Sequence, residues 1–228
     1  MEGILEMINI IFEDNHLLVV EKPINVPVQE DNSKDLDFLN ILKNYIKKRD
    51  NKPGNVYLGL VHRLDRPVGG IMVFAKTSKS ASRLSKQVQN HEFKKTYYAV
   101  VLNKLSHKQG TFTDYLLKDE KTNIVKVDNK GKKAILEYEL IDYKDNMSLV
   151  KINLKTGRSH QIRVQFSSHG YPLYGDHKYN PKVLPNSTIA LFAYSISFYH
   201  PTTKEYLTFK IELPNKYPFN IFKDIDIL

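Results

Sequence analysis

The stretch VHRLDRPVGGIMVFAK, residues 61–76, places one carboxylate between two guanidinium groups just before an apolar run. Asp65 has Arg63 and Arg66 as its charged neighbours, and two glycines follow. Opposite charges on both sides favour the ionised form of a carboxylate. An ionised aspartate can act as a nucleophile or stabilise developing positive charge. The glycines would let a backbone or a ligand come close. A turn or a surface salt bridge is the simpler role for such a residue, and it stays open.

The segment TGRSHQIR, residues 156–163, carries a second group of candidates. Arg158 and Arg163 lie near the start of a short helix that we expect over 160–169, with Ser159 as its N-cap, and a helix N-terminus favours anions. Both arginines could be ordinary surface residues. Alternatively, one pairs with a carboxylate from elsewhere while the other binds a phosphate.

Five histidines could suggest a metal site: His62, His160, His169, His177 and His200. Their spacings match no usual ligand pattern, and the chain has no cysteine to supply a thiolate. We therefore expect hydrogen-bonding or RNA-contacting histidines, with no metal and no cofactor.

The charge balance favours a polyanionic partner. The 228 residues include 34 Lys and Arg against 25 Asp and Glu, a formal net charge of +9. Residues 61–100 hold eight of the basic residues and only two acidic ones. Such a concentration is typical of a surface that faces phosphates.

The helix expected over 77–93 contributes three of these cations on one face, Lys79, Arg83 and Lys86, and Lys94 follows it. A merely solvated face is the alternative. Tyr97 and Tyr98 adjoin the basic segment, and aromatic rings beside positive charge suit stacking on unpaired bases. Neighbouring residues of a strand point to opposite faces, so at most one of the two rings is expected to line a site.

The patterning predicts one mixed α+β domain. Helices are expected over 36–49, 77–93 and 160–169. Two short strands are expected within 7–23, around an Asp14-Asn15 turn. Further strands are expected over 56–61, 69–76, 94–102, 110–119, 133–143 and 147–154, and two more within 187–214, joined at residues 200–203. We find no repeat and no linker that would divide the chain.

The N-terminal sequence MEGILEMINIIFEDN carries glutamates where a signal peptide would have basic residues. No apolar stretch approaches the roughly 18 residues of a membrane span. We expect a cytoplasmic protein with no membrane association, and a monomer.

Several segments together resemble the RluA-type pseudouridine synthases. HRLDRPVGG is similar to the family's His-Arg-Leu-Asp motif, VEKPINVPV to its Lys-Pro segment and KKTYYAVV to its Lys-x-Tyr strand. LKTGRSHQIRVQFSSHGYPLYGDHKY resembles its Thr-Gly-Arg-x-His-Gln-Ile-Arg motif, and LFAYSISFYHPTT its penultimate strand. The matches follow the family's order over nearly the whole chain. Gly69 stands where Ser is commoner and Gln165 where His is frequent.

The resemblance implies the fold, the reaction and the roles of particular residues. It implies a single catalytic domain over residues 1–228, built on a long mixed, mostly antiparallel sheet with flanking helices, and no separate N-terminal RNA-binding module. Asp65 would be the catalytic aspartate, Tyr97 the ring stacked beside the target uracil and Arg163 the cation paired with Asp65. Arg63 would fill the place of the flipped-out uridine. The remaining RNA-binding candidates are His62, Arg66, Lys79, Arg83, Lys86, Lys94, Arg158 and His160.

The implied reaction converts uridine to pseudouridine within ribosomal RNA, which we favour, or transfer RNA. Two other functions are weighed against it. An inactive RNA-binding module would share the basic surface but would not need Asp65, Tyr97 and Arg163 together. A carboxylate-dependent glycosidase or nucleosidase would need a second carboxylate near Asp65, and the sequence offers none nearby.

Overall fold

The computed structural model describes residues 8–31 and 33–222. Residues 1–7, which carried the argument against a signal peptide, lie outside that range. The chain forms two compact units. Unit 1 comprises the described residues up to Lys94 together with Ala193–Ile211, and unit 2 comprises Lys95–Phe192 with the described residues from Glu212 onward.

The described elements alternate between strands and a few helices. In chain order they are β1 (Asn9–Glu13), β2 (Leu17–Lys22), α2 (Phe38–Arg49), β3 (Gly59–Leu60), β4 (Gly69–Ala75), α3 (Ser78–Gln89), β5 (Lys94–Leu102), β6 (Gln109–Asp119), β7 (Ile124–Val127), β8 (Lys132–Lys144), β9 (Met147–Leu154), α4 (Gln161–Ser168), β10 (Leu191–Tyr199), β11 (Tyr206–Lys210) and the 3-10 turn η1 (Phe219–Phe222).

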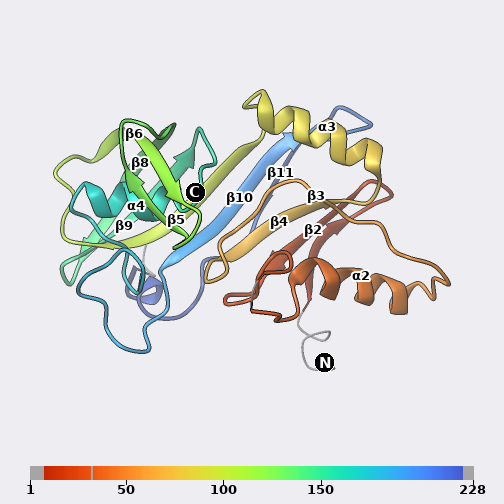
Figure 1. Ribbon diagram of the computed structural model, residues 1–228, viewed down its shortest axis with the longest axis horizontal. Coiled ribbons are helices and arrows are strands. Elements are labelled where there is room, and N and C mark those ends of the chain that lie inside the picture. The colour runs from red at the N-terminus through yellow and green to blue at the C-terminus, as the bar shows by residue number, and fades with distance from the viewer. Residues whose placement is uncertain (1–7, 32, 223–228) are drawn as a thin grey trace. The chain divides into compact units, whose positions relative to one another are not determined.

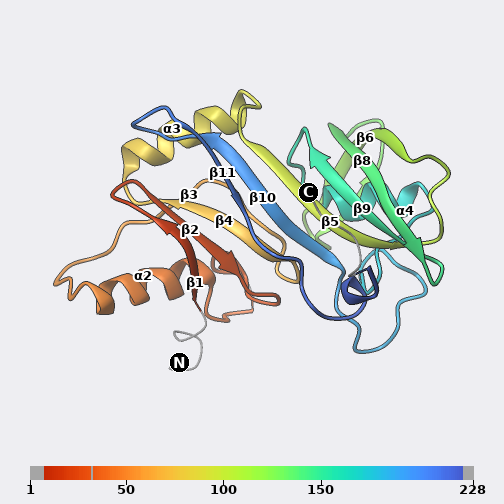
Figure 2. The same cartoon turned by 180° about the vertical axis from the view of Figure 1, so that it is seen from behind.

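Unit 1 is a sheet covered on both faces. β2 pairs antiparallel with β1 and β4, β3 pairs with β4, and β11 pairs with β10. All residues of β4 are buried, as expected for a strand with helices on both sides. Helices α3 and α2 lie on opposite sides of the β2–β4 pair (Figures 1 and 2). Leu84 of α3 packs with Ile71 and Val73, whereas Phe38 of α2 contacts Phe74 edge-on, with ring centroids 6.1 Å apart.

Both helices of unit 1 begin at a side-chain cap. Asp37 accepts a hydrogen bond from the backbone N–H of Asn40, and Thr77 does the same for Ser80. An N-cap of this kind satisfies one of the unpaired donors of the first turn. The helices therefore start at Phe38 and Ser78, slightly later than the periodicity predicts.

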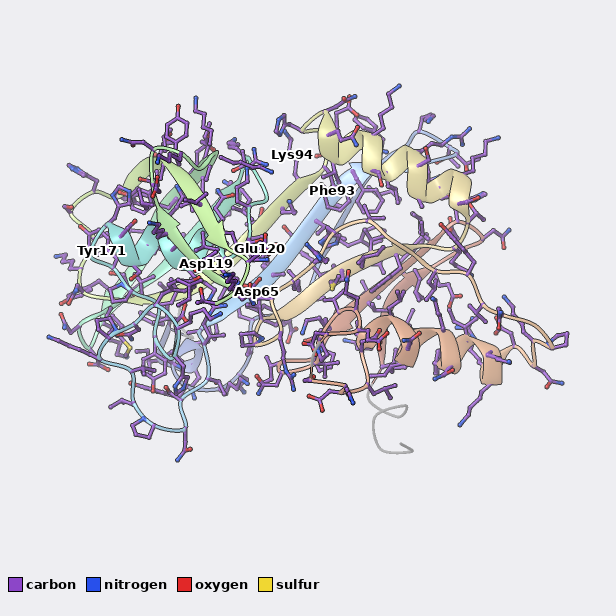
Figure 3. The ribbon with its side chains drawn as sticks, viewed as in Figure 1. Asp65, Phe93, Lys94, Asp119, Glu120 and Tyr171 are labelled. Carbon is purple, nitrogen blue, oxygen red and sulfur yellow. The ribbon has the colours of Figure 1, made fainter. Side chains whose placement is uncertain are left out.

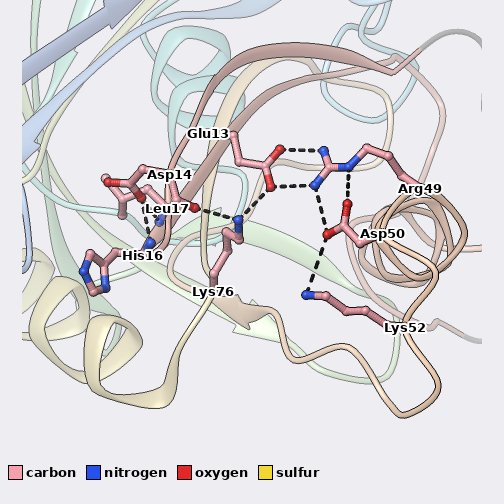
Figure 4. Close-up of polar contacts among 8 residues, drawn as sticks. All are labelled: Glu13, Asp14, His16, Leu17, Arg49, Asp50, Lys52 and Lys76. Carbon is pink, nitrogen blue, oxygen red and sulfur yellow. Dashed lines mark hydrogen bonds and ion pairs between the residues drawn. The ribbon is translucent and has the colours of Figure 1, made fainter.

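A polar network joins the β1–β2 turn to the ends of α2 and β4 (Figure 4). Glu13 accepts two hydrogen bonds from the guanidinium of Arg49, at 2.6 and 2.9 Å, and one from Lys76 at 2.7 Å. Lys76 Nζ also donates to the carbonyl oxygen of Asp14 at 2.6 Å, and Arg49 pairs further with Asp50. The network fixes the turn that precedes β2.

Unit 2 is an antiparallel sheet with strand order β5-β9-β8-β6-β7. Helix α4 packs on it, with Val164 in a cluster with Leu116, Val125 and Ala134 from β6, β7 and β8. The long loop after α4 returns to β5, where the N–H of Val100 donates to the carbonyl of Ala190. Figures 1 and 2 show α4 against these strands.

Two local predictions were wrong, and one strand was not predicted. The strand expected over 56–61 is reduced to Gly59–Leu60, and the four residues of β7 were not anticipated. Ser159 does not cap α4. His160 occupies that position with φ of 50°, and its side chain makes no capping bond. The α+β class with mostly antiparallel pairing and flanking helices is confirmed.

Candidate active site

Asp65 lies on the loop that enters β4 (Figure 3). Its carbonyl accepts a hydrogen bond from the N–H of Val68 at 2.9 Å, which closes a turn, and Leu64 and Val68 anchor the loop in the core. The Asp65 side chain itself is half-buried. The loop thus presents one carboxylate from a fixed backbone.

The buried side chain of Lys22 is hydrogen-bonded to the backbone of the loop that carries Asp65. Lys22 is fully buried at the end of β2, and its Nζ donates to the carbonyls of Pro23, Val26 and Arg66 at 2.7, 2.8 and 3.2 Å. Three carbonyls match the three N–H donors of an ammonium group. Burial lowers the pKa of Lys22 to about 7, while the negative charge of Asp65 acts in the opposite direction. Lys22 therefore tethers the loop that carries Asp65, and it adds a positive charge near Asp65 below about pH 7.

The paired glycines serve backbone packing. Gly70 has φ of +124°, and a Cβ on it would lie 2.3 Å from the carbonyl oxygen of Ala193. Such a conformation and such an approach both exclude other residues. Of the two explanations given by the sequence, the close approach of another strand is the one confirmed.

The neighbours of Asp65 have different roles. Arg63 is exposed. Arg66 forms an ion pair with Asp35 and a longer one with Asp31, with 3.8 Å between charged atoms, so this cation serves the loop before α2. That Arg66 also contacts RNA stays a prediction.

His62 is largely buried and is held by the backbone of β4. Only 9% of the residue is exposed, its ring packs against Phe93, and its Nε2 accepts the backbone N–H of Val73 at 3.2 Å. The ring therefore packs within unit 1, and an RNA contact of His62 stays a prediction.

The basic face of α3 is partly structural. Lys79 and Lys86 are exposed, as expected. Arg83, in contrast, donates from Nη1 to the carbonyl of Pro201 at 2.8 Å and so holds the β10–β11 turn. Lys94 is exposed beside buried Phe93 (Figure 3) and donates to the carbonyl of His91. Lys79, Lys86 and Lys94 therefore remain the better RNA-binding candidates of this segment.

In unit 2, Arg163 is held by a carboxylate close to it in sequence. Its Nε donates to Asp176 Oδ2 at 2.9 Å and its Nη2 to Oδ1 at 2.7 Å, and both side chains are buried. The guanidinium lies over the ring of Tyr179, 5.2 Å from its centroid, and the Tyr179 hydroxyl meets His160 Nδ1 at 2.6 Å. The predicted pairing of Arg163 with Asp65 stays a prediction.

The Thr156-Gly157-Arg158 loop is fastened to β8. The Thr156 hydroxyl accepts the N–H of Ile135, and Gln161 Oε1 accepts the N–H of Arg158 at 3.0 Å. Arg158 Nε donates to the carbonyl of Lys133. The loop is rigid where it presents the exposed Arg158 side chain.

Tyr97 and Tyr98 are both buried on β5, with 6% and 1% of each exposed. They point to opposite faces of the strand, as expected. Tyr97 lies opposite Ile152 of β9, so the antiparallel pairing of β5 with β9 in unit 2 fixes its backbone position.

Three residues important to these arrangements were not assigned a role from the sequence: Lys22, Asp176 and Tyr179. The pairing of an arginine with a carboxylate from elsewhere was anticipated for one of Arg158 and Arg163, but Asp176 was not named. Among the described residues, no group of His, Asp and Glu is placed to hold a metal ion, and no helix is long and apolar enough to cross a membrane.

Comparison with known proteins gives concordant matches. The family model described as RNA pseudouridylate synthase matches residues 16–168. An uncharacterized RNA pseudouridine synthase of Aquifex aeolicus is 34% identical over 92% of this chain and 71% of its own length. A ribosomal large subunit pseudouridine synthase D of Zymomonas mobilis is 32% identical over 91% of this chain and 69% of its own length. The solved structure of human RNA pseudouridylate synthase domain containing 4 covers 93% of this chain and 90% of that one, with a TM-score of 0.77 and 21% identity.

Proposed function

Because the chain belongs to the RNA pseudouridylate synthase family, whose members are isomerases that convert uridine to pseudouridine in RNA, we propose that it acts on large-subunit ribosomal RNA through Asp65. The observation that carries the role of Asp65 is its half-buried carboxylate on a loop tethered by Lys22. The name of the Zymomonas mobilis relative supports ribosomal RNA. Transfer RNA is the alternative substrate.

The reaction breaks the glycosidic bond between N1 of uracil and C1′ of ribose, turns the base and forms a bond from C5 to C1′. The proton on C5 is lost and N1 gains one, so the product is an isomer. The uridine must leave its stack to be reached, which costs a few kcal/mol, and the exposed Arg63 can fill the gap.

Each proposed catalytic residue has one task. Ionised Asp65 attacks C1′ or assists removal of the neighbouring C2′ proton, and both routes remain open. Arg163 keeps this carboxylate charged and oriented. Tyr97 packs on the uracil and helps to remove the C5 proton at the end.

Release of tritium from C5 tests the proposal. An unmodified large-subunit ribosomal RNA transcript, labelled with tritium at C5 of uridine, is incubated with the wild type and with Asp65→Asn. We expect release to water by the wild type alone, with RNA binding retained by the variant. A parallel transfer RNA transcript decides between the two substrates. Binding without release from either RNA would favour an inactive RNA-binding module, and equal loss of binding and turnover would contradict the catalytic role of Asp65.

The remaining expectations are proposals as well. They are a cytoplasmic location and a monomeric state, which light scattering would test.

A further inference from the structure

Lys95 is a cation on the face of β5 that also carries Tyr97, because alternate residues of a strand share a face. The two positions are about 7 Å apart along the strand, a distance that one nucleotide can span. Lys95 is half-buried, and this burial lowers its pKa. Within residues 8–31 and 33–222 its ammonium group has no ion pair or hydrogen bond. A half-buried charge of this kind is stabilised when a ligand brings the opposite charge.

The ammonium group lies over Gly157 of the Thr156-Gly157-Arg158 loop. A Cβ built on Gly157 would be 3.1 Å from Lys95 Nζ, closer than most side-chain contacts. Gly157 itself is exposed, so Lys95 is bounded on this side by a residue without a side chain. Because residue 157 has no side chain, the ammonium group can lie this close to the exposed loop.

Arg158 supplies a second cation next to Gly157. Its side chain is exposed, and its Nε is used by the carbonyl of Lys133. The backbone under it is fixed, since the N–H of Arg158 donates to Gln161 Oε1, and the side-chain amide of Gln161 donates to the carbonyl of Ile135. Because the loop is already ordered, an anion that binds there loses little free energy to ordering.

We propose that Lys95 and Arg158 bind one backbone phosphate of the RNA across Gly157, at the nucleotide that is isomerised or at its direct neighbour. The inference rests on the proposed function and adds Lys95 to its site. Lys95 acts as a point charge on a phosphate oxygen, and the guanidinium of Arg158 donates from the other side. The location beside Tyr97 makes this phosphate a positioning contact for the target base.

The test replaces Lys95 with methionine, which keeps the apolar stem and removes the charge. Filter binding of an unmodified large-subunit ribosomal RNA transcript is measured across a salt series, together with tritium release. Loss of one charge-assisted contact should raise Kd and KM about tenfold or more, with a smaller change in kcat. The slope of log K against log salt should fall by about 0.7 to 0.9.

Two further variants separate charge from packing. Lys95→Arg should keep the salt slope of the wild type. Gly157→Ala should weaken binding in the same direction as Lys95→Met, because the new methyl group displaces the ammonium. Lys126→Met is the matched control, since Lys126 is an exposed lysine of unit 2 already paired with Asp128.

A Lys95→Met protein with the Kd, KM and salt slope of the wild type would overturn the inference. If Lys95→Met does not fold, the same binding measurement is made on Gly157→Ala and Lys95→Arg. Binding by Gly157→Ala that equals that of the wild type would then overturn the phosphate contact. Absence of tritium release by the wild type would instead overturn the proposed function, and the binding data would still report on the phosphate contact.

Discussion

Arg163 and Asp176 form a buried ion pair with two parallel hydrogen bonds, of 2.9 and 2.7 Å. Asp176 Oδ1 also accepts the backbone N–H of Lys178 at 3.0 Å, so the same carboxylate orders the chain after it. Two-point pairing fixes the plane of a guanidinium as well as its place. Asp176 is thus a positioning residue for Arg163.

Replacement of Asp176 by asparagine should destabilise unit 2 and misplace Arg163. Breaking a buried pair leaves an uncompensated charge, which costs about 3 kcal/mol. We expect a loss of this size in urea unfolding, and a decrease in kcat larger than the change in KM. Glu137→Gln, which alters a more exposed ion pair with Lys155, is the control and should change stability little. An unfolding free energy equal to that of the wild type would show that Asp176 does not support Arg163.

The network around Glu13 should make stability depend on acidity. The hydrogen bond from Arg49 lowers the pKa of Glu13; burial opposes this, and Lys76 adds to the lowering (Figure 4). A carboxyl group with a lower pKa in the folded state stabilises the protein above its unfolded pKa, near about 4.3. That stability is lost as the pH falls through the folded pKa.

Glu13→Gln should therefore unfold more easily than the wild type at pH 7, by about 1 kcal/mol, with the difference shrinking below about pH 4. Urea unfolding at pH 7, 5 and 3.5 measures it. Glu205→Gln, at an exposed position of the β10–β11 turn, should show no such trend. A difference that stays constant with pH would mean that Glu13 acts through packing alone.

Local sequence patterns predicted most helices and strands. They did not predict side-chain contacts between residues that are far apart in the sequence. β5 spans Lys94–Leu102, the bounds that the sequence predicted for it. The amphipathic pattern of α3 correctly placed Leu84 in the core. The sequence could not show that Arg83 reaches Pro201, 118 residues later, because that contact depends on how β10 returns beside α3. The same limit applies to His62, whose hydrogen bond to Val73 requires the folded path of β4.

Substitution of the basic residues of α3 should affect either RNA binding, for Lys79 and Lys86, or thermal stability, for Arg83. Lys79 and Lys86 are exposed, so their joint replacement by alanine should weaken RNA binding and reduce the salt slope by about 1.4 to 1.8, with Tm unchanged. Arg83→Ala should instead lower Tm, because the Pro201 carbonyl loses the shorter of its two hydrogen bonds and keeps only the one from Lys204 Nζ at 3.3 Å. Filter binding over a salt series and thermal unfolding distinguish them. If the double variant leaves the salt slope unaltered, the face is only solvated.

Lys22 should give the protein a stability that rises with pH above neutrality. Its pKa is lowered by burial to about 7 in the folded protein, whereas an unfolded lysine has a pKa near about 10.4. Between these values the unfolded chain holds more protons than the folded one. The free energy of unfolding therefore gains up to about 1.4 kcal/mol per pH unit from this residue.

Lys22→Met removes that dependence and also the hydrogen bond to the Arg66 carbonyl beneath the Asp65 loop. We expect the unfolding free energies of the wild type and the variant to diverge as pH rises from 7.5 to 9.5. The kcat of the variant should fall, because the loop that carries Asp65 is less well held. Lys210→Met, at an exposed position of β11, provides the comparison and should follow the wild type. Parallel pH curves for wild type and Lys22→Met would mean that Lys22 stays charged in the folded protein throughout this range.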